Sequence, residues 1–179
     1  MNWRAMTALP ADHYVVMRLG SRRCALPCAA VREVLPLPRL WRPPGLPRPL
    51  AGFMNLAGEA VPVLDLPRLF GLAASGDAED ALYRHLLLTS GEGKPLLALL
   101  VDRVLDMRRI PPERLRPVPP EATLNGCATA EIETPEGFIH LLAPDRILLA
   151  QEAATLATLR EGAQSRLAEW EGAGREGAA

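Results

Sequence analysis

Histidines and cysteines are the side chains of this sequence that could bind a metal or carry out redox chemistry. Cys24 and Cys28 have a C-x3-C spacing, which is neither a C-x-x-C redox pair nor half of a zinc site. Together with Cys127 the cysteines are odd in number, which argues against a disulfide framework. The histidines lie in or beside strand-like segments and lack the H-x3-H and H-E-x-x-H spacings of zinc ligands. They are His13, His85 and His140. We therefore expect no metal, and cysteines that serve as small buried apolar residues.

The candidate catalytic carboxylates are Asp65, Asp102 and Asp106. Asp65 precedes Leu66-Pro67, which is typical of a helix N-cap, and Asp102 follows an apolar strand-like run. The sequence has no dinucleotide-binding, phosphate-loop or serine-hydrolase motif and no nucleophile beside a base. We therefore expect no catalytic residue, no cofactor and no enzymatic activity.

Composition indicates a folded chain outside the membrane. Its 179 residues suit one domain or two small subdomains, with 49% hydrophobic and 23% charged residues. The longest apolar run is residues 96–101, far below the roughly 18 residues of a membrane span. Because the N-terminus also lacks the apolar stretch of a secretory signal, we expect a cytoplasmic protein without membrane insertion.

Charge is unevenly distributed along the chain. Residues 1–50 hold eight arginines against Asp12 and Glu33, a net charge of +6, whereas the whole chain has −1. The arginines are scattered among prolines and strand-like segments with few aromatics, which argues against nucleic-acid binding. An arginine-rich protein interface fits better, because arginine is enriched at such interfaces.

Hairpin-like pairs of segments dominate the first 142 residues. Short β-rich runs are separated by glycine- or proline-containing turns, a pattern typical of small antiparallel barrels or a sandwich. The paired runs are 14–19 with 22–26, 50–56 with 60–66, 83–89 with 95–101, and 124–132 with 137–142. Residues 36–49 include six prolines, so we expect an extended loop there, with Trp41 held within it.

The C-terminal segment has a helical period. Apolar residues recur at steps of three and four from Ile147 to Trp170, with Gly162 as the weak point. We expect the part up to Leu159 to pack on the chain itself. The part carrying Leu167 and Trp170 is then left to meet a partner or a second copy.

Four stretches, in this order, resemble the CheW-like family. They are YVVMRLGSRRCALPCAAVREVLPLP, LAGFMNLAGEAVPVLDLPRLFGL, LLALLVDRVLDM and LNGCATAEIETPEGFIHLLAPDRILL. The most specific is G-x-x-N-L-x-G-x-x-x-P-V-x-D-L at residues 52–66, and L-L-V-D-x-V at 99–104 is a second. The family comprises the coupling adaptor of bacterial chemosensory arrays and the regulatory domain of its histidine kinase.

The resemblance implies a mainly β fold of two intertwined SH3-like, five-stranded antiparallel β-barrel subdomains, to which the helical period adds a C-terminal amphipathic helix. The sequence of residues 1–12 predicts a flexible leader, and the resemblance implies a CheW-like domain at 13–149. That domain divides into a first barrel at about 13–71, a second at about 81–142, and a C-terminal return to the first. An amphipathic helix at 150–171 and a disordered tail at 172–179 complete the chain.

The resemblance also implies a scaffold or adaptor that couples a chemoreceptor of the methyl-accepting type to a CheA-type histidine kinase, without a cofactor. Two alternatives remain open: a detached regulatory module of such a kinase, and a small-ligand-binding β-barrel. The second would need convergent polar groups in a pocket.

The partner-binding residues that the resemblance suggests lie in two segments. They are Val31, Glu33 and Val34 in the first, and Asn55, Leu56, Ala57 and Gly58 in the second. The family usually has Asn-Leu-Arg-Gly in the second segment, and its arginine pairs with the acid at Glu33. Ala57 removes that partner, which suggests a divergent, non-flagellar chemosensory system. A structural role remains an alternative: Val31, Val34 and Leu56 as core, and Asn55 and Gly58 as turn residues.

Overall fold

The computed structural model describes residues 12–73, 83–89, 95–118 and 126–176, and side chains as far as residue 169. Almost all of the expected leader and residues 177–179 of the expected tail therefore lie outside the described residues. Within the described part, no helix is long and apolar enough to cross a membrane.

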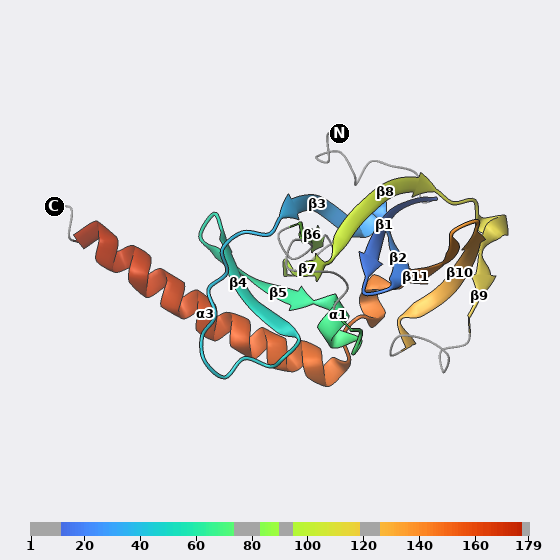
Figure 1. Cartoon of the computed structure of the whole chain (residues 1–179). Helices are drawn as coiled ribbons and strands as arrows, with labels where there is room; N and C mark the ends of the chain where they lie inside the picture. Colours follow the sequence, from blue (N-terminus) through green and yellow to red (C-terminus); the bar gives the residue numbers. More distant parts are fainter. Residues whose placement is uncertain (1–11, 74–82, 90–94, 119–125, 177–179) are drawn as a thin grey trace.

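A six-stranded sheet forms one side of the molecule, in the order β8-β1-β2-β11-β10-β9 (Figure 1). Its strands are β1 (His13–Leu19), β2 (Arg22–Pro27), β8 (Arg103–Arg109), β9 (Arg116–Pro117), β10 (Ala128–Thr134) and β11 (Gly137–Leu142). The first hairpin turns at Gly20, whose φ of 60° favours glycine. The expected hairpins β1–β2 and β10–β11 are both present.

A five-stranded sheet forms the other side, in the order β3-β6-β7-β5-β4. Its strands are β3 (Val31–Pro36), β4 (Leu50–Leu56), β5 (Glu59–Asp65), β6 (His85–Thr89) and β7 (Ala98–Val101). This mainly β fold with a C-terminal helix confirms the expected class. The sheets are mixed, however, because β2 pairs in parallel with β11 and β5 in parallel with β7.

The two sheets exchange strands, so they do not follow the two halves of the chain. β1 and β2 pair with strands from the second half, whereas β6 and β7 pair with strands from the first. The largest apolar cluster accordingly takes residues from both sheets, such as Val15 and Met17 with Leu87 and Leu99. Each sheet also has a smaller cluster of its own. The shared cluster makes the two sheets one folding unit.

Short helices connect the strands. They are the 3-10 turns η2 (Cys28–Ala30), η3 (Pro112–Arg114) and η6 (Pro144–Arg146), and the α-helix α1 (Leu66–Leu69). The Asp65 carboxylate accepts a hydrogen bond from Arg68 N at 3.1 Å, and Pro67 lies in the first turn. The predicted N-cap of α1 is therefore confirmed.

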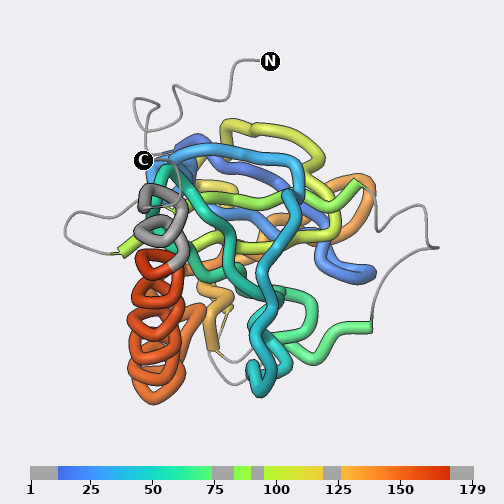
Figure 2. The backbone as a smooth tube through the Cα atoms, turned by 90° about the vertical axis from the view of Figure 1, so that its left-hand side faces the viewer, coloured from blue at the N-terminus to red at the C-terminus, as the bar shows by residue number. Residues whose placement is uncertain are grey.

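The C-terminal helix α3 (Ala150–Glu176) lies against the β4–β5 hairpin (Figure 2). It runs without a break through Gly162 and continues to Glu176, beyond the expected end at residue 171. The expectation that packing stops near Leu159 is wrong. Ala163 is buried, and Leu167 packs against the apolar cluster that Ala163 forms with Leu50, Phe53 and Ala60. The apolar stripe continues past Gly162, and its burial outweighs the cost of about 1 kcal/mol for an internal glycine.

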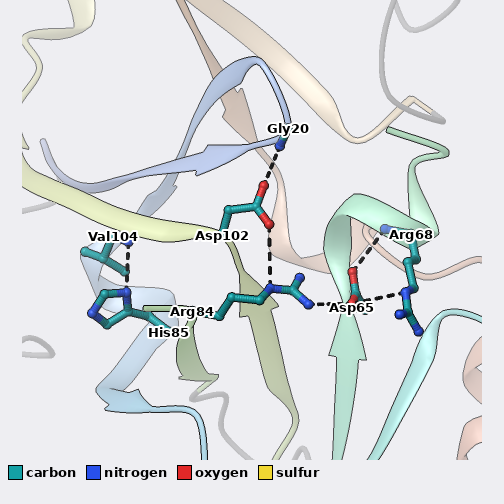
Figure 3. A network of polar contacts seen from close by, with 7 residues as sticks. All are labelled: Gly20, Asp65, Arg68, Arg84, His85, Asp102 and Val104. Carbon is teal, nitrogen blue, oxygen red and sulfur yellow. Dashed lines mark hydrogen bonds and ion pairs between the residues drawn. The ribbon is translucent and has the colours of Figure 1, made fainter. Parts of the chain in front are cut away.

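A buried network of charged groups lies where the two sheets meet (Figure 3). Arg84, just before β6, donates to Asp65 Oδ2 at 2.9 Å, and its Nε lies 3.6 Å from Asp102 Oδ1. Asp102 in turn accepts a hydrogen bond from Gly20 N at 2.7 Å. One guanidinium therefore connects the start of α1, the end of β7 and the turn of the first hairpin.

Replacing Arg84 tests how much this network contributes. Arg84→Met should lower the free energy of unfolding by about 3 kcal/mol, because the buried Asp65 and Asp102 would both lose a cation, while Arg68 would still lie 3.5 Å from Asp65. Arg116→Met is the matched control, since the Arg116–Glu133 pair is exposed and should contribute at most about 1 kcal/mol. Denaturant unfolding measures both variants. An Arg84→Met loss no larger than that of the control would contradict the role of the network.

Two half-buried histidines should make stability fall in mild acid. Burial, and secondly the charge of Arg103, lower the pKa of His85 below its ordinary value of 6.5. Burial and Arg22 also lower the pKa of His140. The unfolded chain then binds protons more readily, so stability is present above about pH 6.5 and is lost as pH falls through the folded-state pKa values.

Denaturant unfolding between about pH 7 and pH 5 should therefore show a falling free energy of unfolding. The double variant His85→Gln, His140→Gln should flatten this dependence. An unchanged slope in the double variant would assign the pH dependence to other groups.

Candidate docking surface

The predicted partner-binding residues come from the two edge strands of the five-stranded sheet. One segment lies in β3 and the other at the end of β4 and in the turn that follows it. Leu35 of β3 and Leu56 of β4 pack against the same apolar cluster. The fold therefore places both segments on one sheet, at the two strands that have no neighbour on one side.

The β4–β5 turn is a tight two-residue connection. Leu56 pairs with Glu59, and both intervening residues have positive φ, 52° for Ala57 and 87° for Gly58. This is the type I′ geometry that matches strand twist. The side-chain oxygen of Asn55 accepts a hydrogen bond from Gly58 N at 2.8 Å. Asn55 and Gly58 thus shape the turn, and Asn55 and Ala57 are exposed on it.

Strand β3 contributes fewer accessible side chains than its sequence suggests. Val31 is fully buried in the shared core, and Val34 packs against the same core. The register shifts between Val31 and Glu33 in the pairing with β6, so Arg32 is the extra residue of a β-bulge. Glu33 is half-buried and forms no salt bridge with any residue that the structure describes. Of the β3 candidates, Glu33 is the one with a polar group to offer a partner.

Helix α3 holds the turn through a side chain that the sequence did not single out. Gln164 Oε1 accepts a hydrogen bond from Ala60 N at 2.8 Å, and Gln164 Nε2 donates to Gly58 O at 2.9 Å. One amide thereby satisfies two backbone groups beside the turn. One helical turn earlier, Arg160 pairs with Glu59 at 2.6 Å. The sequence indicated these contacts only weakly, because Arg160 and Gln164 are simply two polar residues beside the apolar stripe of the helix.

The proline-rich segment covers part of the free edge of β4. Trp41 N donates to Phe53 O and Phe53 N donates to Trp41 O, each at 2.8 Å. The two rings also lie 5.9 Å apart between centroids. Gly52 permits this approach, since a Cβ there would lie 2.7 Å from the Trp41 carbonyl oxygen. Beyond this bridge the edge continues to the exposed turn.

A wide groove of about 1240 Å³ lies beside α3, between the helix and the loops at residues 29–30 and 95–97. Its lining is mostly apolar, including Leu97, Leu148 and Leu156. Of its polar side chains, Arg160 and Gln164 already bind the hairpin. The other polar residues of its lining are Thr89, Asp145, Glu161 and Ser165.

The cysteines have no reactive character. All three are buried thiols outside any disulfide. Burial raises the pKa of Cys24 to about 12 and those of Cys28 and Cys127 to about 11. These thiols stay protonated near neutral pH and pack as apolar groups. The described residues also contain no group of three metal-ligating side chains.

Removing the amide of Gln164 should weaken the attachment of α3 to the turn. Gln164→Ala leaves Ala60 N and Gly58 O without partners, so we expect a loss of about 1–3 kcal/mol in the free energy of unfolding. Faster amide exchange at residues 57–60 should accompany it. Gln151→Ala, at an exposed position of the same helix, is the control. Equal effects of the two changes would show that Gln164 does not hold the turn.

Comparison with known proteins gives consistent matches. A model of the CheW-like domain family matches residues 13–152. The chain is 32% identical over 152 residues to Protein FrzA of Myxococcus xanthus, and the aligned stretch covers 85% of each protein. It is 28% identical over 109 residues to a probable chemotaxis protein CheW of Rhizobium etli. That match covers 59% of this chain and spans only 65% of the length of the Rhizobium protein.

A solved structure extends the likeness to three dimensions. The scaffolding protein TtCheW from Thermoanaerobacter tengcongensis aligns with a TM-score of 0.65, over 76% of this chain and 86% of that one. At 24% sequence identity this match establishes the fold. Since the family model spans most of the chain and the FrzA match covers 85% of it, the chain belongs to the CheW-like domain family.

Proposed function

We propose that this protein is a cytoplasmic, non-catalytic adaptor that couples a chemoreceptor to a CheA-type histidine kinase in a divergent, non-flagellar chemosensory system. The observation that carries the proposal is the arrangement of the five-stranded sheet. Its two edge strands and its exposed β4–β5 turn present Glu33, Asn55 and Ala57 from a rigid framework. Such a surface suits docking of another protein.

Rigidity of the turn supports this role. The side chain of Asn55 fixes the turn from within, and Gln164 and Arg160 of α3 fix it from outside. A preorganised loop loses little conformational entropy when a partner binds. Few such contacts would be needed if the turn were only a connection between two strands.

The substitution at Ala57 supports the divergent system. Family members usually carry arginine there, paired with the acid that corresponds to Glu33. Here Glu33 has no salt bridge with a described residue. A rim charge changes encounter rate and specificity more than fold stability. The proposal therefore includes kinase binding that is retained and weak binding to a standard chemoreceptor tip.

Affinity capture from the native cell tests the proposal. The protein should bring down a histidine kinase with a regulatory domain of the same family, together with a chemoreceptor. Capture of neither would overturn the adaptor role.

Restoring the missing charge tests the part of the proposal that concerns Ala57. Ala57→Arg should raise affinity for a standard chemoreceptor tip, by about tenfold if Glu33 pairs with the new cation. Ala57→Gln is the matched control, since it adds a long side chain without charge. Ala57 is exposed, so neither change should disturb the core. Titration in which the two variants bind equally well would contradict the charge argument.

A further inference from the structure

A small apolar pocket lies where the proline-rich segment, the β4–β5 hairpin and α3 meet. Its volume is about 360 Å³. Side chains from all three elements line it, among them Trp41, Phe53, Asn55, Ala163, Arg166 and Leu167. Ala163 and Leu167 belong to the half of α3 that packs on the hairpin, so the docked helix forms one wall of the pocket.

The mouth of this pocket carries an aromatic ring and a cation. Trp41 is 43% exposed although its backbone is tied to Phe53. The guanidinium carbon of Arg166 lies 5.9 Å from the centroid of the Trp41 ring, a cation–π distance. Arg166 is exposed and forms no salt bridge with a described residue. Glu169, one turn further along α3, is exposed and is not paired with it.

The segment that carries Trp41 is also positively charged. Residues 36–49 contain Arg39, Arg42 and Arg48 and no acidic residue. None of these three arginines forms a salt bridge within the described part of the chain. The nearest acid on the hairpin is Glu59, and it is already paired with Arg160. The segment that carries Trp41 therefore has positive charge that no described acid neutralises.

We propose that this pocket receives a bulky apolar side chain of a partner protein, and that carboxylates flanking that side chain pair with Arg166. The volume suits one large side chain, and tryptophan and arginine are the residues most enriched at binding hot spots. The uncompensated arginines favour an acidic partner segment, because complementary charge speeds encounter and selects the partner.

This inference rests on the proposed function only in that both assign a protein partner to the hairpin. It adds the chemistry of that partner and a second contact surface, formed by Trp41 and α3. Its test uses a synthetic peptide and is therefore independent of the capture experiment. Peptide binding can fail while the kinase and the receptor are captured, and it can succeed while neither is captured.

The test is a titration of the full chain with dye-labelled peptides, followed by fluorescence anisotropy. The probe peptide carries one phenylalanine flanked by glutamates, and a matched peptide carries lysines in their place. Arg166→Glu removes the proposed cation at an exposed position. Arg22→Glu, on β2 of the other sheet, makes the same charge change at an exposed site far along the chain.

The acidic peptide should bind the wild type, more weakly as salt is added, and the lysine peptide should not. Arg166→Glu should reduce affinity for the acidic peptide by about tenfold or more, whereas Arg22→Glu should change it by less than about twofold. Trp41→Ala should also weaken binding. The proposal is wrong if the acidic peptide does not bind, if both peptides bind equally, or if the two charge reversals have the same effect.

Discussion

The contact of Arg84 with two buried carboxylates is the constraint on which the rest of the structure depends. Asp65 and Asp102 lie in the two most specific sequence stretches, and both carboxylates face the same guanidinium. Asp65 also caps α1, and Asp102 holds the first turn through Gly20. Buried charges are costly unless paired. The network therefore ties together the end of β5, the end of β7 and the first turn, which explains why two aspartates are buried at the sheet junction.

Fixing the crossing of the strands also positions the candidate docking surface. β5 ends at Asp65, and the same strand begins at the turn that carries Ala57 and Gly58. At that outer end, helix α3 packs on the hairpin in place of a neighbouring strand. It contributes the hydrogen bonds of the Gln164 amide, the Arg160–Glu59 ion pair and an apolar contact. The β4–β5 hairpin is thus held at both ends. The Asp65–Arg84 contact holds it at the sheet junction, and helix α3 holds it beside the turn.

Local features of this fold could be predicted from the sequence, and contacts between distant segments could not. The positions of glycine and proline predicted the hairpins, and Asp65 predicted the start of α1. The 3.6-residue period of apolar residues predicted the C-terminal helix. The parallel pairs β2–β11 and β5–β7 join segments far apart in the chain, so no local pattern indicates them. The helical period identified the apolar face of α3 but not the surface of the protein on which this face packs. The packing of Leu167 was therefore not predicted. At the candidate surface, Asn55 and Gly58 were recognisable as turn residues. The burial of Val31 follows from the bulge at Arg32, which depends on pairing with β6.

Hydrogen exchange in the presence of partners tests the docking account most directly. The protein would be compared alone, with the regulatory domain of the cognate kinase, and with the cytoplasmic tip of the cognate receptor. The account predicts slower exchange at the free edges of the five-stranded sheet, near residues 32–35 and 55–58, with at least one of these partners. Protection confined to the six-stranded sheet, or no protection with either partner, would contradict it.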